Sequence, residues 1–281
     1  MALKDVITQG STVVATTGND LRSSVQRMET EFAKALPKGI EAKQFLRDAM
    51  SVLSTNPRLA ECERNSFIGG LMTMAQLGLR PGVSGLGHGW LLPMRVSGQL
   101  RAQLIIGYQG WLALAHRSDK IESVEVRTVH ENDEFAVEYG TDSRLIHRPT
   151  LRGSRGPETG AYAVVKAGGG VYWEWMSQAD LEEHRDRFAM AKKNGAIVGP
   201  WRDHFWAMAK KTVLKRALWY APRSTDIITS MAADETVRLD TSPDVEPETV
   251  SVHVVTDDDG TEGFDPTVQA PFAPQEAPQN G

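Results

Sequence analysis

The stretch WLLPMRVSGQLRAQLIIGY, Trp90–Tyr108, contains two runs in which apolar residues alternate with other types, around a short turn sequence. Alternation with a period of two places successive side chains on opposite faces of a strand, which is typical of a half-buried sheet. The joining residues, SGQ at 97–99, include the glycine that tight turns favour. The sequence therefore predicts a β-hairpin from Trp90 to Gly107.

Upstream of the hairpin, apolar residues recur at helical spacing. The first such segment opens with Asn19 and Asp20 as candidate caps, and Pro37 and Gly39 follow its end. The predicted helices are residues 19–36, 41–54 and 64–79.

A glycine-rich loop, RPGVSGLGHG at Arg80–Gly89, separates these helices from the hairpin. Its glycines suggest a phosphate-binding loop. However, no Gly-Lys-Ser/Thr sequence follows, and no helix is predicted to start there. The support for a phosphate loop is therefore weak.

Downstream of the hairpin, one helical segment, residues 108–118, precedes a series of short alternating segments with turn residues between them. The predicted strands are residues 120–130, 134–140, 143–149, 160–170 and 171–177. Two more helices follow, residues 177–195 with Ser177 as cap and residues 201–222 with Pro222 at the end. Helices, then a mainly antiparallel sheet, then helices again predict an α+β fold with a helix-flanked sheet and a hairpin.

The composition fits a packed intracellular protein. Apolar residues make up 41% of the 281 residues, and Cys62 is the single cysteine, which excludes an intramolecular disulfide and a cysteine-based metal site. No apolar run approaches the roughly 20 residues of a membrane helix. The first residues lack the basic and apolar regions of a signal peptide. We therefore expect a cytoplasmic protein without membrane contact.

Charge is unevenly distributed along the chain. Residues 236–281 hold ten acidic residues and one basic residue, Arg238, whereas the preceding residues hold 26 acidic and 30 basic ones. The same end has six prolines and only two aromatic residues, so it cannot bury enough apolar surface to offset chain entropy. We expect a flexible segment at 1–18, a core domain at 19–235 and a disordered acidic tail at 236–281.

Two roles for this tail remain open. It either keeps the protein soluble or docks a protein partner, in which case Phe264 would be its natural anchor. Within it, TVSVHVV, starting at Thr249, alternates like a strand that would form on a partner.

The last predicted helix contains AMAKKTVLKRALW, Ala207–Trp219, with four cations and no acid. At about 100° per residue, Lys210 falls in the middle of the apolar stripe, Lys211 and Lys215 lie together at its edge, and Arg216 lies apart. Two interpretations stay open for Lys210. Its ammonium group extends to water along its own stem, or it lies on the floor of a groove that binds an anion. Cations near aromatic residues would suit a phosphate backbone with stacked bases.

Two other function classes fit less well. The densest cluster of candidate metal ligands, HENDE at His130–Glu134, lies at a strand end like an ordinary turn, and no pair has compact metal-ligand spacing. A sequence-specific duplex reader needs side chains that reach base edges, and the basic helix carries too few of them. We therefore expect neither an enzyme nor a duplex reader.

Three blocks bring a specific resemblance. LGLRPGVSGLGHGWLLPMR, QLIIGYQGWLALAHRSDKI and GPWRDHFWAMAKKTVLKRALWYAP, in this order and at these distances, resemble the RecT family of phage single-strand annealing proteins, over roughly residues 75–222. The resemblance implies a protein that binds single-stranded DNA and anneals it to a complementary strand without ATP. It also implies an α+β fold whose copies assemble side by side into rings or helical filaments, with DNA in a continuous positive groove.

The resemblance also implies partners. They are single-stranded DNA, the annealed duplex intermediate, further copies of the chain, a partner exonuclease, and the host single-strand binding protein through the acidic tail. No cofactor is expected, and Mg²⁺ would only modulate annealing by screening phosphates. A protein that binds and protects single strands without annealing them is the alternative.

Individual positions follow from the matched blocks. GYQG, Gly107–Gly110, matches a family position that usually reads Gly-Tyr-Lys-Gly, so Gln109 removes a charge there. Its glycine pair lets a backbone approach a ligand closely. Arg117 matches a family arginine, although Asp119 stands where glycine is usual. For Arg101 and Arg117, a bond to a neighbouring loop remains as open as a DNA contact. The residues expected to contact DNA are Arg101, Gln103, Tyr108, Gln109, Arg117, Lys210, Lys211, Lys215 and Arg216.

Overall fold

A computed structural model describes residues 18–83, 85–96, 98–189, 192–193, 195–244 and 249–251. The predicted flexible segment, apart from Gly18, and the tail beyond residue 251 lie outside these residues. The helices are α1 (Gly18–Arg27), α2 (Glu29–Ala35), α3 (Ala42–Thr55), η1 (Pro57–Glu61), α4 (Arg64–Gln76), α5 (Tyr108–Arg117), α6 (Gln178–Phe188), α7 (Pro200–Asp203), α8 (Phe205–Tyr220) and α9 (Thr225–Ala233). The strands are β1 (Gly89–Val96), β2 (Gln99–Ile106), β3 (Ile121–His130), β4 (Glu134–Glu138), β5 (Arg144–Arg148), β6 (Glu158–Ala167), β7 (Gly170–Ser177), β8 (Lys192–Lys193), β9 (Ala196–Ile197), β10 (Thr236–Arg238) and β11 (Thr249–Ser251).

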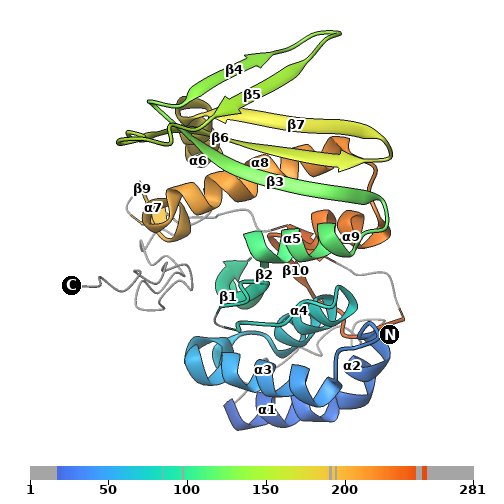
Figure 1. Ribbon diagram of the computed structural model, residues 1–281. Coiled ribbons are helices and arrows are strands. Elements are labelled where there is room, and N and C mark those ends of the chain that lie inside the picture. The colour runs from blue at the N-terminus through green and yellow to red at the C-terminus, as the bar shows by residue number, and fades with distance from the viewer. Residues whose placement is uncertain are drawn as a thin grey trace, which may run out of the picture.

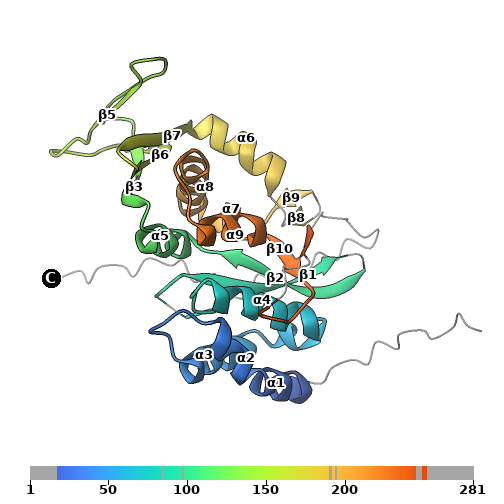
Figure 2. The ribbon, with the colours of Figure 1, turned by 90° about the vertical axis from the view of Figure 1, so that its right-hand side faces the viewer.

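The elements stack in layers (Figure 1). Helices α1 to α3 form one end, and α4 separates them from the sheet β1-β2-β10-β11. Helices α5, α8 and α9 lie between this sheet and a second one, β3-β6-β7, as the turned view in Figure 2 also shows. The β4–β5 hairpin covers the far side of the second sheet. The predicted α+β class with antiparallel sheets is confirmed.

The predicted hairpin is present with a regular register. Strands β1 and β2 pair antiparallel from Gly89 opposite Ile106 to Val96 opposite Gln99. Helix α4 packs on this hairpin so closely that a Cβ atom on Gly70 would lie 2.5 Å from a methyl carbon of Leu91. The hairpin is thus fixed by a helix that crosses it at short range.

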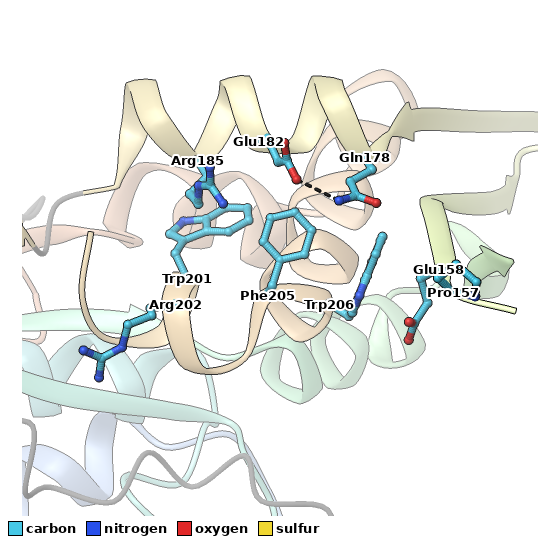
Figure 3. Close-up of a pocket in the computed structure, with 9 residues that line it drawn as sticks. All are labelled: Pro157, Glu158, Gln178, Glu182, Arg185, Trp201, Arg202, Phe205 and Trp206. Atoms are coloured by element: carbon cyan, nitrogen blue, oxygen red, sulfur yellow. Dashed lines mark hydrogen bonds between the residues drawn. The ribbon is translucent and has the colours of Figure 1, made fainter. Parts of the chain in front are cut away.

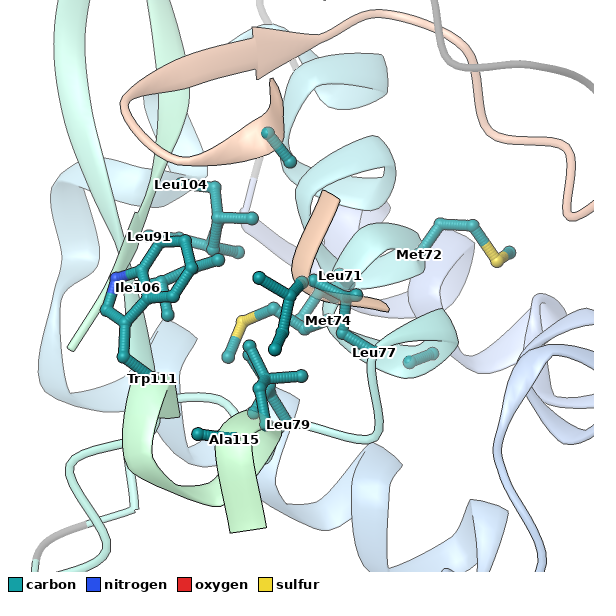
Figure 4. Close-up of a cluster of buried hydrophobic side chains, with 14 of the residues drawn as sticks. Leu71, Met72, Met74, Leu77, Leu79, Leu91, Leu104, Ile106, Trp111 and Ala115 are labelled. Atoms are coloured by element: carbon teal, nitrogen blue, oxygen red, sulfur yellow. The ribbon is translucent and has the colours of Figure 1, made fainter. Parts of the chain in front are cut away.

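The main hydrophobic core includes residues of this hairpin. Trp111 of α5 is fully buried, together with Leu71 and Met74 of α4 and Leu91 and Ile106 of the hairpin (Figure 4). Burying such side chains contributes about 1.5–3 kcal/mol each. The core therefore joins the hairpin, α4 and α5 into one unit.

The beginning of the predicted acidic tail belongs to the fold. Strand β10 pairs with β2 at Thr236 opposite Leu104, and Val237 is fully buried. Arg238 is 3% exposed and donates to Gln76 of α4 at 2.7 Å and to Asp240 at 2.8 Å. The prediction that the chain is disordered from Thr236 onward is therefore wrong for β10. The one basic residue of the predicted tail, Arg238, has carboxylate and amide partners there. Strand β11 pairs with β10 of its own chain rather than with a partner.

The second sheet carries α8 on one face and the β4–β5 hairpin on the other. Phe135 of that hairpin lies 4.3 Å, centroid to centroid, from Trp175 of β7. At the base of the hairpin, the buried carboxylate of Asp133 accepts bonds from His147 at 3.0 Å and from Arg155 at 3.0 Å. It also accepts from the backbone N–H groups of His130 and Thr150. The HENDE cluster is therefore an anchor for the hairpin.

Helix ends depart from the predictions where the backbone breaks. The predicted helix 19–36 is interrupted at Met28, and the predicted helix 201–222 at His204, whose φ of −140° is not helical. Helix α6 begins at the predicted cap, where Ser177 and Asp180 form a capping box, but ends at Phe188. Helix α9 was not predicted. None of the described helices has the length and apolar character needed to cross a membrane.

Candidate nucleic-acid interface

Helix α8 carries the four predicted cations and is packed on two opposite sides. Strands β6 and β7 lie against one side and α5 against the other. The helical wheel used for the prediction, with a single apolar stripe, does not describe such a helix, because residues on both sides of α8 are buried. The environment of each cation therefore depends on which neighbouring element it meets.

Lys211 is buried in an ion-pair cluster. It is 4% exposed, and its Nζ atom lies 3.2 Å from Asp234 Oδ2 and 3.3 Å from Glu235 Oε1. Lys215 Nζ lies 2.6 Å from the same Asp234 oxygen. The Asp234 carboxylate also accepts from the backbone N–H of Ile106 in β2 at 2.8 Å. The cluster therefore ties α8 to the end of the hairpin.

Two pKa shifts reflect this cluster. Burial is the largest influence on Asp234 and would raise its pKa, but Lys211 and Lys215 together hold that pKa below its usual value. Burial is also the largest influence on Lys215 and would lower its pKa, but Asp234 and Glu235 raise it instead. Both shifts favour the charged forms of Asp234 and Lys215, so their ion pair is a structural contact.

The backbone around this cluster is unusual. Glu235 has a φ of +67°, the left-handed region that non-glycine residues rarely adopt. Its carbonyl oxygen accepts a bond from the buried amide of Gln103 at 2.8 Å. Gln103, predicted to contact DNA, is thus 1% exposed and holds the turn between α9 and β10.

Lys210 has a different environment from its neighbour. Its Nζ atom lies 5.6 Å from the centroid of the Tyr108 ring, and no carboxylate within the described ranges forms an ion pair with it. Burial raises the pKa of Tyr108, so the phenol stays neutral. Gln109, the next residue, is exposed. We call Lys210 and Tyr108, together with the exposed Gln109 that follows Tyr108 in α5, the Lys210 platform.

Two glycines, Gly107 and Gly110, let the start of α5 pack closely against the glycine-rich loop. A Cβ atom on Gly107 would lie 2.2 Å from the carbonyl oxygen of Gly87, and one on Gly110 would lie 2.0 Å from that of His88. The space next to these glycines is thus filled by the glycine-rich loop of the same chain, not left for a ligand. The loop continues into strand β1 rather than into a helix, as the sequence predicted.

The remaining predicted cations have partners within the chain. Arg101 donates to Glu63 at 2.7 Å, Arg216 donates to Glu174 at 2.6 Å, and Arg117 lies 3.1 Å from Asp226. Arg101 is largely buried, whereas Arg216 and Arg117 are partly exposed. In the structure, which contains no DNA, Arg101 and Arg117 therefore bond to neighbouring segments of the chain, which is one of the two interpretations left open for them.

A groove that the sequence did not predict opens one turn before Lys210 (Figure 3). Trp201, Phe205 and Trp206 line it from α7 and the start of α8, and α6 forms its other wall. Its volume is about 410 Å³. The break at His204 creates it, because α7 and α8 present their aromatic side chains to α6 from two short segments. In the sequence, the aromatic residues of WRDHFW, 201–206, could have indicated this groove.

Comparison with known proteins adds to this geometry. The model of the RecT family matches residues 43–250. The chain belongs to the RecT family. It is 38% identical to Protein RecT of Escherichia coli strain K12 over 244 residues, which cover 84% of this chain and 88% of that protein. It is also 28% identical to the uncharacterized protein YqaK of Bacillus subtilis strain 168 over 182 residues, 64% of this chain and 59% of YqaK.

Membership of the RecT family confirms the resemblance seen in the sequence. It makes this chain a DNA-binding protein of single-strand annealing and DNA recombination. The matched region spans the β1–β2 hairpin, the sheet β3-β6-β7, the groove and all of α8. Of the residues predicted to contact DNA, the structure places Lys210 over Tyr108, leaves Gln109 exposed, and buries Lys211 and Gln103.

Among the described residues, no group of three or more His, Cys, Asp and Glu side chains could hold a metal ion. The HENDE cluster is occupied by its own hydrogen bonds, with Arg155 supplying the positive charge next to Asp133.

Proposed function

We propose that this chain binds single-stranded DNA and anneals a complementary strand to it without ATP, as part of phage-type homologous recombination. The observation that carries the proposal is the Lys210 platform in a member of the RecT family. It offers an ammonium group without a carboxylate partner in the described chain, next to an aromatic ring and an exposed amide.

Annealing requires positioning rather than covalent chemistry. Two polyanions must come together, so their repulsion has to be reduced by cations that contact phosphates. Phosphate contacts position a strand without reading its sequence. The incoming strand then reads the sequence by base pairing, so base edges have to face outward. The continuation of the glycine-rich loop into a strand, without a Lys-Ser/Thr pair, supports a mechanism without bound ATP.

Assembly and partners extend the proposal. Copies of the chain would lie side by side in rings or helical filaments, so that one Lys210 platform follows another along the strand. A partner exonuclease would expose that strand. Residues 252–281, with six acidic residues and no Lys or Arg, would dock protein partners, including the host single-strand binding protein. Mg²⁺ would act by screening phosphates, and the protein would work in the cytoplasm.

Sequential addition of two complementary oligonucleotides tests the proposal. Purified protein receives the strands one after the other, or already annealed, without ATP, and the retained complex is measured across a salt series. We expect the sequential product to resist higher salt than either single-strand complex and than the pre-annealed duplex. Equal retention of the pre-annealed duplex would identify a duplex binder. Retention of single strands without product formation would support the protective single-strand binder instead.

A further inference from the structure

The aromatic groove and the Lys210 platform are adjacent along α8. Trp206 and Lys210 are four residues apart in the same helix, so their side chains lie on one face, about 5–6 Å apart at Cβ. Trp206 lies at the end of the groove opposite Trp201 (Figure 3). The groove therefore ends one helical turn from Lys210, on the same face of α8.

The groove walls combine flat rings with hydrogen-bonding groups. The Phe205 and Trp206 rings meet edge to face at 5.1 Å, and Trp201 lies 5.7 Å from Phe205. The guanidinium of Arg185 lies 5.7 Å from the Phe205 ring. Gln178 and Glu182 of α6 add amide and carboxylate groups, hydrogen-bonded to each other at 2.8 Å. Flat rings with such polar groups beside them suit a flat heterocycle that carries donors and acceptors.

The charges in the groove disfavour a bare phosphate. Arg185 is paired with Asp186 at 2.7 Å, and Arg202 with Asp203 at 2.7 Å. Glu158 and Glu182 also line the walls. Since the arginines are already neutralised and two further carboxylates face the space, an anion gains little there. A neutral ring gains stacking without that repulsion.

We propose that this groove holds one unpaired nucleobase of the bound single strand, stacked on Trp206, while Lys210 contacts the adjacent phosphate. The proposal deepens the proposed function and rests on it. A volume of about 410 Å³ lies in the range of small-molecule sites. A base in the groove is separated from its neighbours, so it must leave the groove before it pairs. The groove therefore favours a single strand over a duplex.

Abasic oligonucleotides separate base contacts from phosphate contacts. Binding of an oligothymidylate is compared with that of a strand of equal length whose bases are removed at several central positions. On wild-type protein, we expect the abasic strand to bind at least about fivefold more weakly, because stacking on an aromatic side chain contributes about that much per base. The same penalty should vanish in Trp206→Ala. It should persist in Lys210→Ala, which weakens both strands equally.

Two further variants serve as controls. Trp219, at the other end of α8, is 57% exposed and lies under the Arg223 guanidinium, so Trp219→Ala should keep the full penalty. Trp206→Leu retains apolar volume against the core without an aromatic face, and it replaces Trp206→Ala if that variant does not fold.

Each outcome decides the proposal. An equal penalty in wild-type protein and in both Trp206 variants, or no penalty in wild-type protein, overturns the base site while single-strand binding stands. Failure of wild-type protein to bind either strand overturns the proposed function and the base site with it. A penalty that depends on Trp206 alone supports the site.

Discussion

Two neighbouring lysines of α8 have opposite environments. Lys211 is buried beside Asp234 and Glu235, at the junction of α8, the hairpin and the start of β10. Lys210, one residue earlier, lies over Tyr108 beside the exposed Gln109. The basic helix therefore has one lysine that is paired inside the fold and one that has no carboxylate partner among the described residues.

The difference shows that cation density alone does not identify a DNA contact. A buried lysine with two carboxylate partners has already exchanged its hydration for ion pairs, so a phosphate would have to displace them. A lysine over an aromatic ring keeps its donors for a ligand. We therefore propose that partners within the chain, not the number of charges, decide which cation of α8 binds DNA.

The largest expected effect concerns Lys211. Lys211→Ala should lower the free energy of unfolding by about 3 kcal/mol, because Asp234 then remains buried with Lys215 as its main counter-ion. Urea unfolding of the purified protein measures this. The double variant Lys211→Met, Asp234→Asn removes both charges and should recover much of the loss. A loss below about 1 kcal/mol in Lys211→Ala would show that the cluster is not structural.

A second carboxylate extends the comparison to the β4–β5 hairpin. The Arg155 guanidinium holds the pKa of Asp133 below its ordinary value of 3.8, against the opposing effect of burial. Because the folded-state pKa is depressed, the stabilisation is complete above the ordinary value and is lost as the pH falls below it. Asp133→Asn should cost about 2 kcal/mol at pH 7. It should cost less at pH 3, measured by urea unfolding at both pH values. An equal cost at both would contradict this sign.

Lys210 should affect DNA and not the fold. Lys210→Ala should reduce the log–log slope of single-strand affinity against salt by about 0.7, the value for one phosphate contact. Its unfolding free energy should change by less than about 0.5 kcal/mol. Fluorescence anisotropy with a labelled oligonucleotide over a salt series measures the slope. Lys210→Arg is the matched control and should keep it. An unchanged slope in Lys210→Ala would remove Lys210 from the interface.

The smallest expected effect is a gain. Gln109 is exposed on the Lys210 platform, so Gln109→Lys should add one phosphate contact and steepen the salt slope by about 0.7. Gln109→Glu, of similar size, should weaken binding at low salt. If neither variant changes the slope, the strand does not pass over Gln109.

The hairpin, the α+β class and the helix cap at Ser177 were predictable, because alternation, turn residues and caps are local signals. The environments of the lysines in α8 were not predictable. Lys211 is paired by Asp234, which lies 23 residues later in the chain and reaches α8 only because α9 and β10 turn back on it. The helical wheel also assumed one buried side, whereas α8 is covered on two.

The tail boundary failed for a similar reason. Composition correctly marked an acidic, proline-rich segment, but it could not show that Val237 would be buried and that Arg238 would bond to Gln76 and Asp240. The groove could not be predicted, because the sequence around His204 is typical of one continuous helix, whereas the backbone at His204 is not helical. Long-range pairing and single backbone breaks are not encoded in local patterns.

Lysine labelling tests the division of α8 most directly. Wild-type protein is treated briefly with an amine-acetylating reagent, with and without saturating oligothymidylate, and acetylation at each lysine is quantified by mass spectrometry. We predict that Lys210 is acetylated in the free protein and protected by the oligonucleotide, while Lys211 stays unmodified in both samples. Protection of Lys211 by DNA, with Lys210 labelled equally in both samples, would contradict the account.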